Sequence, residues 1–509
     1  MLRLRLASEM TQQELHNQRL FEEARKEMLR QHTRRHFLKE SAMGLGALAL
    51  GSFLNSCGRS SSQHASNILI DPVNPLAPRP PMFPGRAKSV IYLHMAGAPS
   101  QLELFDYKPD LMKLDGQDCP PSLLEGKRFA FIRGVPKMLG PQATFKQYGE
   151  SGIWLSNYLP HFSSIVDDVA IIKSVTTDQF NHAPAQLFMH TGFPRLGRPS
   201  IGAWVTYGLG TENQNLPGYV VLTSGGNDPD AGKSAWGSGF LPSVYQGVQC
   251  RSEGDPVLFM NDPQGMDRDL RRASIDAINK INQHQHEQYK DPETLSRIAQ
   301  YEMAYKMQIA APEVMNINDE PQYIHDMYRT KPGEVSFANN ILLARRLVEK
   351  GVRFVQLFDW GWDSHGTNAD TAVDIGLINK CREVDKSMTA LILDLKQRGL
   401  LDETLVIWGG EFGRTNYCQG SFTKENYGRD HHPRCFTIWM AGGGVKPGVY
   451  GETDEFGYNI AKDPVHVHDF HATVLNLMGL NHEQLTFKHL GRRYRLTDVS
   501  GELVKGLMA

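Results

Sequence analysis

The stretch TLVIWGGEFGRT occupies residues 404–415. Its apolar run, Leu405 to Trp408, ends in two glycines, and the carboxylate of Glu411 follows at once. A short apolar run that ends at glycines and then turns polar is typical of a buried parallel strand that leads into a loop. Ligands of open α/β sheets bind beyond the carboxyl ends of such strands. The position of Glu411 therefore predicts a functional residue, and the motif GRDHHP at 428–433 brings acids and histidines into the same loop.

The bulk composition is that of an ordinary soluble protein. The chain has 509 residues, a net charge of -2 and 22% charged residues, so it is long enough to bury a large core. This near-neutral balance argues against a nucleic-acid-binding protein, which normally carries a basic patch. One large domain and two domains are both compatible with this length, and no oligomeric state is predicted.

The cysteines do not suggest a thiolate metal site. The chain has six cysteines, and no two of them have the CxxC spacing of a zinc site. Cys418 and Cys435 flank the loop that holds the polar cluster. A disulfide between them and two separate free thiols are both compatible with the sequence.

The N-terminal segment predicts export. The string TRRHFLK, with Arg34 and Arg35, precedes an apolar run from Ala42 to Leu54 that is too short to cross a bilayer comfortably. A basic region before a short apolar run is a secretory signal, and the twin arginine marks the Tat route. We therefore interpret residues 1–57 as a pre-signal extension followed by a Tat signal, and we expect the protein in the periplasm or at the cell surface.

The end of the predicted signal also contains a candidate lipidation site. The sequence from Leu54 to Cys57 resembles a bacterial lipobox, in which Cys57 would be acylated after cleavage, but Asn55 departs from the pattern. Residues 58–87 are rich in Ser, Pro and Asn and predict a linker. Contact with a membrane is thus expected only through the signal or a lipid anchor.

The rest of the chain, residues 88–509, alternates strands and helices. Helices are predicted over Phe337–Lys350, along a buried stripe that includes Val384 and Leu395, and over Asp469–Met478 with Asp469 as its cap. A polar helical insertion is expected at about 265–330. Strands are predicted at Lys88–Met95, Val169–Val175, Gly218–Thr223, Val352–Phe358, Leu405–Trp408 and Phe436–Met440. This alternation predicts an α/β fold with a mostly parallel central sheet and helices on both faces.

Acidic and histidine side chains gather at the ends of these strands. Asp359, Asp363 and His365 follow one strand, and the loop after the strand at 169–175 carries Asp178 and His182. Mixed carboxylates and imidazoles suit a divalent zinc, manganese or iron ion. The predicted metal ligands are Asp363, His365, Glu411, His431 and His432. The alternative is that Glu411 forms an ion pair with Arg414 or Arg429. A serine hydrolase is disfavoured, because no GxSxG motif occurs.

Several motifs resemble a known superfamily. TLVIWGGEFGRT resembles the strand that ends in Asp-His-Gly in alkaline phosphatases and sulfatases, AGGGVKPGVYG at 441–451 resembles the turn that follows, and VHVHDFHATVLNLMGL at 465–480 resembles a superfamily helix. His182 to Gln186, followed by Thr191-Gly192, has the layout of the sulfatase signature. With HMAGAPSQLELFDYKP at 94–109, DWGWDSHG at 359–366 and GRDHHP, the sequence resembles the DUF1501 family over about residues 88–490. This resemblance implies an exported, Tat-dependent, sulfatase-like protein with the alkaline phosphatase-like fold.

The chain departs from the superfamily at its functional positions. His182 stands where a sulfatase has the Cys or Ser that becomes formylglycine, and Gln186 replaces the signature arginine. Gly97 replaces a metal-binding Asp, and Glu411 with Phe412 replaces the Asp-His pair. These differences argue strongly against formylglycine chemistry.

Two functions remain compatible with the sequence. One is metal-dependent hydrolysis of a sulfate or phosphate ester, with a polysaccharide as one candidate substrate. His182 would then face the substrate as a metal ligand or a nucleophile, and Arg414, Arg429 and Gln186 would bind the anionic group. The other is a non-catalytic exported binding or scaffold protein that uses the same fold.

Overall fold

The central element is a nine-stranded sheet with the order β12-β4-β11-β8-β1-β7-β5-β6, in which β15 also pairs with β4. Most pairs are parallel, including those of β1 with β7 and β8, whereas β11 runs antiparallel to β4 and β8. The mostly parallel sheet predicted from the sequence is therefore confirmed. Its strands are β1 (Ser89–Ala96), β4 (Val169–Thr176), β5 (Tyr219–Ser224), β6 (Val248–Gln249), β7 (Phe354–Trp360), β8 (Thr404–Gly409), β11 (Phe436–Ala441), β12 (Gly448–Tyr450) and β15 (Val465–His466).

The computed structural model describes residues 68, 70, 71, 74–125, 132, 134–251, 262, 264–423 and 425–509. The predicted Tat signal with Arg34 and Arg35, and the candidate lipidation site Cys57, lie outside these residues. In the part of the chain that is described, no helix is both long and apolar enough to cross a membrane.

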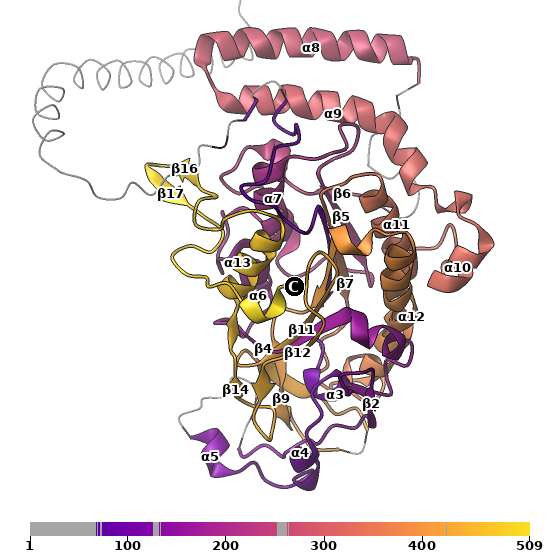
Figure 1. The fold of residues 1–509 in the computed structure, drawn as a ribbon, viewed down its shortest axis with the longest axis vertical. Coiled ribbons are helices and arrows are strands. Elements are labelled where there is room, and N and C mark those ends of the chain that lie inside the picture. The colour runs from indigo at the N-terminus through magenta and orange to yellow at the C-terminus, as the bar shows by residue number, and fades with distance from the viewer. Residues whose placement is uncertain are drawn as a thin grey trace, which may run out of the picture. The chain divides into compact units, whose positions relative to one another are not determined.

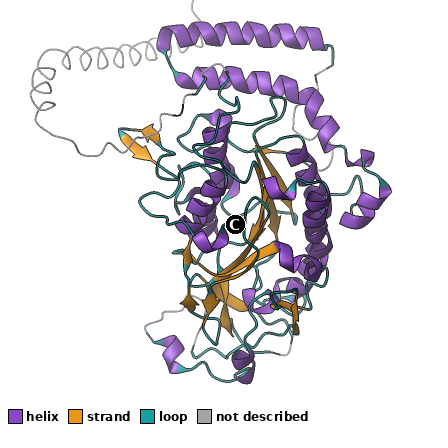
Figure 2. Ribbon diagram, viewed as in Figure 1, coloured by secondary structure: helices purple, strands orange, loops and turns teal. Residues whose placement is uncertain are grey.

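Helices cover both faces of the sheet, as Figure 2 shows. On one face, α6 (His182–Thr191), α7 (Ile201–Leu209) and α13 (Val467–Leu477) share a buried cluster with Val90 and Tyr92 of β1. On the other, α11 (Phe337–Glu349) and α12 (Gly376–Gln397) pack against Ile91 and Leu93. Because successive side chains of a strand point to opposite faces, one apolar run supplies both cores.

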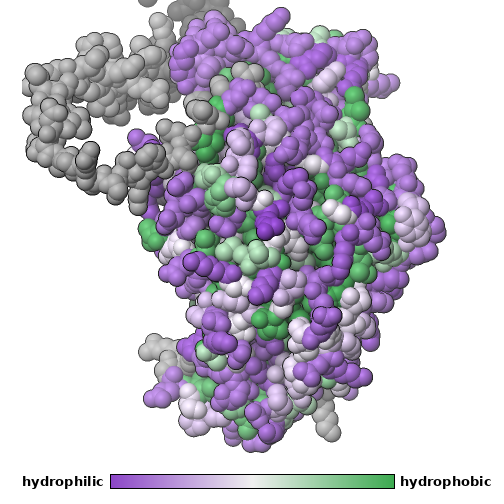
Figure 3. Space-filling model, viewed as in Figure 1, coloured by the Kyte–Doolittle hydropathy of each residue, from purple (hydrophilic) through white to green (hydrophobic). Residues whose placement is uncertain are grey.

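The predicted helical insertion consists of α8 (Arg268–Tyr289), α9 (Pro292–Met315) and α10 (Gln322–Tyr328). Helix α9 reaches the core through Met307 and Val314. Helix α8 lies on α9 away from the sheet, and only Ile275 and Asn282 of α8 are buried. The hydrophilic surface at this end of the molecule in Figure 3 agrees with its polar sequence.

Short elements complete the described chain. The loop predicted after β8 contains an antiparallel pair, β9 (Gly413–Cys418) and β10 (Arg429–His432). The other two-stranded sheets are β2 (Phe145–Tyr148) with β3 (Ile153–Ser156), β13 (Glu452–Thr453) with β14 (Ile460–Lys462), and β16 (Phe487–His489) with β17 (Arg492–Tyr494). The remaining helices are α3 (Gln101–Leu104), α4 (Pro109–Lys113) and α5 (Pro121–Leu124).

Two local predictions are corrected, and one open alternative is decided. Residues 74–87, assigned to a linker, lie against the domain, and the Arg79 guanidinium donates to the carbonyls of Thr206 and Tyr207 in the last turn of α7. The N-cap of α13 is His466. Asp469 is the third residue of the helix, and its side chain accepts a hydrogen bond from the His466 N–H. Cys418 and Cys435 are separate, buried free thiols.

Candidate metal centre

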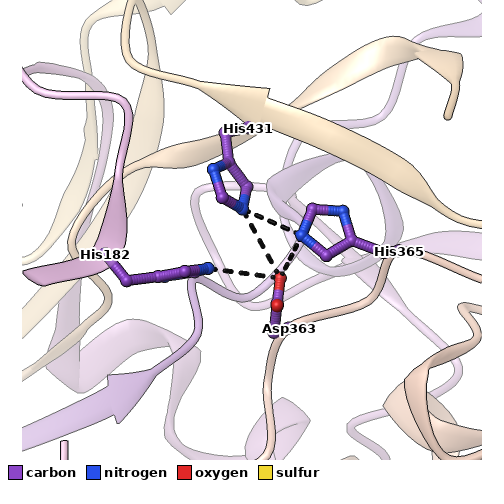
Figure 4. A group of neighbouring side chains, drawn as sticks. All are labelled: His182, Asp363, His365 and His431. Atoms are coloured by element: carbon purple, nitrogen blue, oxygen red, sulfur yellow. Dashed lines mark hydrogen bonds and ion pairs between the residues drawn. The ribbon is translucent and has the colours of Figure 1, made fainter. Parts of the chain in front are cut away.

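Four side chains meet at the carboxyl edge of the sheet. His182 is the first residue of α6, Asp363 and His365 follow β7, and His431 lies on β10. One potential ligand atom of each lies within 4.8 Å of the others, and Figure 4 shows the three imidazoles directed at the Asp363 carboxylate. The structure thus brings together three of the predicted metal ligands and His182, which the sequence predicts as a metal ligand or a nucleophile.

The separations suit a first-row metal ion. His365 Nε2 lies 2.8 Å from Asp363 Oδ1 and 2.9 Å from His431 Nε2. His182 Nε2 and His431 Nε2 lie 3.4 and 3.6 Å from the same Asp363 oxygen. Ligands that each bind an ion at about 2.0–2.2 Å are spaced by about 3 to 4 Å from one another. The four donors therefore need only small side-chain movements to share one ion.

The tautomers of two histidines direct lone pairs into the cluster. His431 Nδ1 lies 2.7 Å from the Phe180 carbonyl, and His182 Nδ1 lies 2.6 Å from Glu411 Oε1. Both oxygens can only accept, so each Nδ1 carries a proton and the Nε2 of each neutral ring keeps its lone pair. Once His182 has lost its Nε2 proton, as metal binding requires, two nitrogen lone pairs and the Asp363 carboxylate face one another, an arrangement that a bound cation stabilises.

Glu411 supports the cluster from behind and is not one of its ligands. Its carboxylate is fully buried. Oε1 accepts from His182 Nδ1, from Gln186 Nε2 at 3.1 Å and from the Gly97 N–H at 3.1 Å, while Oε2 lies 3.3 Å from His94 Nε2. The predicted ligand role is wrong for a physical reason: Glu411 turns toward the end of β1, where buried donors surround it.

The shifted pKa values follow from these contacts. Burial alone would lower the pKa of His182, but its hydrogen bonds to Asp363 and Glu411 raise it to about 9. Burial would raise the pKa of Asp363, but Arg414 and the three histidines hold it well below its usual range. Burial lowers the pKa of His431. Without a metal ion the site is therefore balanced by a proton on His182, which a metal ion would displace.

His432 points away from the cluster. Its Nε2 lies 2.7 Å from the Tyr458 carbonyl oxygen, and its ring stacks on that of Tyr458 with centroids 4.5 Å apart. His431 and His432 are consecutive residues of β10, and consecutive strand residues face opposite sides. They cannot both face one ion, so the prediction of His432 as a ligand is corrected.

The predicted substrate-binding residues are occupied internally. Arg429 is buried, forms an ion pair with Glu103 at 2.5 Å and donates to three backbone carbonyls. Arg414 is also buried and donates to Asp363 and to the carbonyls of Gly97 and Ala98. The amide of Gln186 is held by Glu411 and by the Ala231 N–H. In the structure these three side chains support the site, and none of them faces an open substrate position.

Sequence reasoning missed His94. It lies in the otherwise apolar run of β1, is fully buried and contacts the far side of Glu411. The signal that could have found it is a titratable residue within a buried strand, one position before Met95 and close to the strand end.

The sequence of this chain was compared with models of known protein families. Residues 87–508 match the family described as "Protein of unknown function (DUF1501)". The chain belongs to the DUF1501 family. A search of curated proteins finds no match.

Structural neighbours of the DUF1501 protein are sulfatases and members of the alkaline phosphatase superfamily. One is the PsFucS1 sulfatase from Pseudoalteromonas sp., with 12% identity, a TM-score of 0.35, and coverage of 78% of this chain and 69% of that chain. Another is the lipoteichoic acid synthase LtaP from Listeria monocytogenes, with 10% identity, a TM-score of 0.33, and coverage of 80% and 77%. A third is the alkaline phosphatase from the Antarctic bacterium TAB5, with 11% identity, a TM-score of 0.31, and coverage of 78% and 99%.

The cluster predicts metal binding that depends on His365 and not on His432. We expect protein purified from its native host to contain a transition metal by elemental analysis, and we expect His365→Ala to lose it. His432→Ala is the matched control, because the same change is made to a histidine that faces away. Equal metal content in all three proteins would contradict the site.

Glu411→Gln is expected to weaken metal binding by about 10–100-fold, the usual cost of altering a group that orients a ligand. The amide keeps the size of the carboxylate and can still accept from His182 Nδ1, but it removes the charge that makes the imidazole a stronger donor. Competition against a chromophoric chelator measures the affinity. An affinity equal to that of the wild type would show that Glu411 does not act through His182.

Arg429→Met is expected to destabilise the fold by about 3–5 kcal/mol, because it leaves the Glu103 carboxylate buried without its cation. The double variant Glu103→Gln/Arg429→Met should recover most of this loss. Urea unfolding followed by tryptophan fluorescence measures both. A stable single variant that has lost only substrate affinity would restore the substrate-binding role predicted from the sequence.

Proposed function

We propose that this DUF1501 protein is a metal-dependent hydrolase of phosphate or sulfate esters. The observation that carries the proposal is the convergence of three imidazole Nε2 atoms and the Asp363 carboxylate at the carboxyl edge of the sheet. Two of the imidazoles, those of His182 and His431, are fixed by acceptors at Nδ1. Ligands oriented in this way from behind are typical of metal sites built into a rigid scaffold.

The charge of the site supports an anionic substrate. Asp363 is the one carboxylate in the cluster, and Arg414 forms an ion pair with it. A divalent ion would make this cluster net positive, and as a Lewis acid it would polarise the ester oxygen and offset the charge that develops in the transition state. Asp363 is 37% exposed, so a substrate can reach the cluster from solvent.

The attacking group in this proposal is water. Position 182 holds a histidine in place of the hydroxyl or thiol of the sulfatase signature. Its Nδ1 is held by Glu411 and its Nε2 faces Asp363 at 3.4 Å, so both ring nitrogens are engaged. We therefore prefer His182 as a ligand over His182 as a covalent nucleophile. Arg414 keeps Asp363 in place, and Glu411 keeps the His182 ring oriented.

The sequence supports two further parts of the proposal. The TRRHFLK string supports Tat export to the periplasm or cell surface, where the candidate substrates include anionic polysaccharides. Acylation of Cys57 would add a lipid anchor to the exported chain.

Metal-loaded protein is expected to hydrolyse at least one member of a panel of aryl phosphate and aryl sulfate esters. His365→Ala should lower kcat/KM by more than about 100-fold, since the loss of a ligand exceeds the usual effect of a supporting group. His432→Ala should retain activity. Stable metal binding without hydrolysis across the panel and with sulfated polysaccharides would instead favour the non-catalytic binding protein.

A further inference from the structure

The β16–β17 hairpin carries a leucine where folding does not favour one. Leu490 and Gly491 form a two-residue turn closed by the pair His489 and Arg492, and their φ angles are +47° and +86°. Positive φ at both positions is the type I′ pattern, which prefers Asn-Gly and disfavours residues with a bulky side chain. Leu490 is nevertheless 91% exposed, so packing does not explain it.

A second exposed leucine lies in the loop that packs beside this hairpin. Leu196 is 71% exposed. Two residues later, the Arg198 guanidinium lies over the Tyr494 ring of β17 at 4.5 Å and over the Phe193 ring at 4.6 Å. These contacts fix loop 193–198 against the hairpin, which stands out from the body in Figure 1. We call residues 193–198 and 487–495 together the hairpin surface.

The hairpin surface is basic. It contains no acidic residue, and its cations are Arg195, Arg198, Lys488, Arg492, Arg493 and Arg495. Asp498 pairs with Arg198 and Arg492, and Glu483 pairs with Arg495. Arg195, Lys488 and Arg493 have no carboxylate partner among the described residues. This local excess stands out in a chain that carries 54 Lys and Arg against 56 Asp and Glu.

Exposed leucines within a cationic rim match one kind of partner better than others. Aliphatic side chains can enter the acyl boundary of a membrane, while Lys and Arg attract anionic headgroups. A glycan would instead stack on open aromatic faces. Here Arg198 and Arg492 lie over the Tyr494 ring, and Phe240 stacks on His489. We propose that the hairpin surface binds the surface of an anionic phospholipid bilayer through Leu490 and Leu196.

This contact is independent of the proposed hydrolase activity and of the predicted N-terminal anchor. It would hold the folded domain against a membrane at a second point. Membrane contact would also explain why a leucine occupies a position with a positive φ. Asn would be less strained there, but only an apolar side chain can enter the bilayer.

A local probe tests the proposal in the full chain. Leu490→Cys is labelled with an environment-sensitive fluorophore in a Cys57→Ser background, since the described cysteines are buried. Vesicles of phosphatidylcholine with phosphatidylglycerol should shift the emission to the blue, and added salt should reverse the shift. Tyr323→Cys is the control, because Tyr323 is 64% exposed on α10, far from the hairpin in Figure 1.

Leu490→Asn separates binding from folding. Asn-Gly is the preferred type I′ sequence, so this variant should unfold at the same temperature as the wild type or a higher one. A label at Leu196→Cys should nevertheless lose most of its blue shift in the Leu490→Asn background. The proposal is overturned if the label at Leu490→Cys does not shift, if it shifts equally with pure phosphatidylcholine, or if the control shifts equally. It is also overturned if dextran sulfate shifts the label and vesicles do not.

Discussion

The site depends on one fully buried carboxylate. Glu411 is removed from water, which is costly unless every lone pair is matched by a donor or a cation. His182, Gln186 and the Gly97 N–H surround one of its oxygens, and His94 faces the other. These partners come from α6, from β1 and from the residue after β1. The need to satisfy a single charge therefore fixes a helix start, a strand end and the loop after β8 relative to one another.

Asp363 is likewise stabilised by a buried partner that also contacts the end of β1. The Arg414 guanidinium from β9 donates to Asp363 and to the carbonyls of Gly97 and Ala98, so the end of β1 is also the anchor for the second carboxylate. The Nδ1 atoms of His182 and His431 also have acceptors outside the cluster, namely Glu411 and the Phe180 carbonyl. His365 differs, because its Nδ1 has no hydrogen-bond partner in the described structure. Of the four donors, it is the imidazole with the most freedom to adjust to an ion.

Strand ends were predictable from the sequence, whereas side-chain direction was not. Apolar runs placed Asp363 and His365 at the carboxyl edge, and parallel strands bring such ends together. Arg429 was predicted to bind substrate, but it pairs with Glu103, a buried glutamate 326 residues away. The sequence around an arginine does not show which of these partners it contacts. The sequence does not show which of His431 and His432 faces the cluster, because RDHH lacks the β-branched and aromatic residues that are typical of a strand. Had β10 been recognised, the alternation of faces would have selected one of them.

The departures from the sulfatase pattern are related to one another. Phe412 stands where the motif that the sequence resembles has a histidine, and a phenyl ring cannot ligate an ion. In the structure its ring packs against the rings of His182 and His431, at 4.9 and 4.5 Å. The two imidazoles, one from α6 and one from β10, thus pack against the phenyl ring and against each other, with their own centroids 4.4 Å apart. His182 also stands where the sulfatase motif that the sequence resembles has its nucleophile. Under the proposal, this one residue would supply a metal ligand and would leave no hydroxyl or thiol there for covalent catalysis. The proposed hydrolase would therefore depend on metal-assisted attack by water.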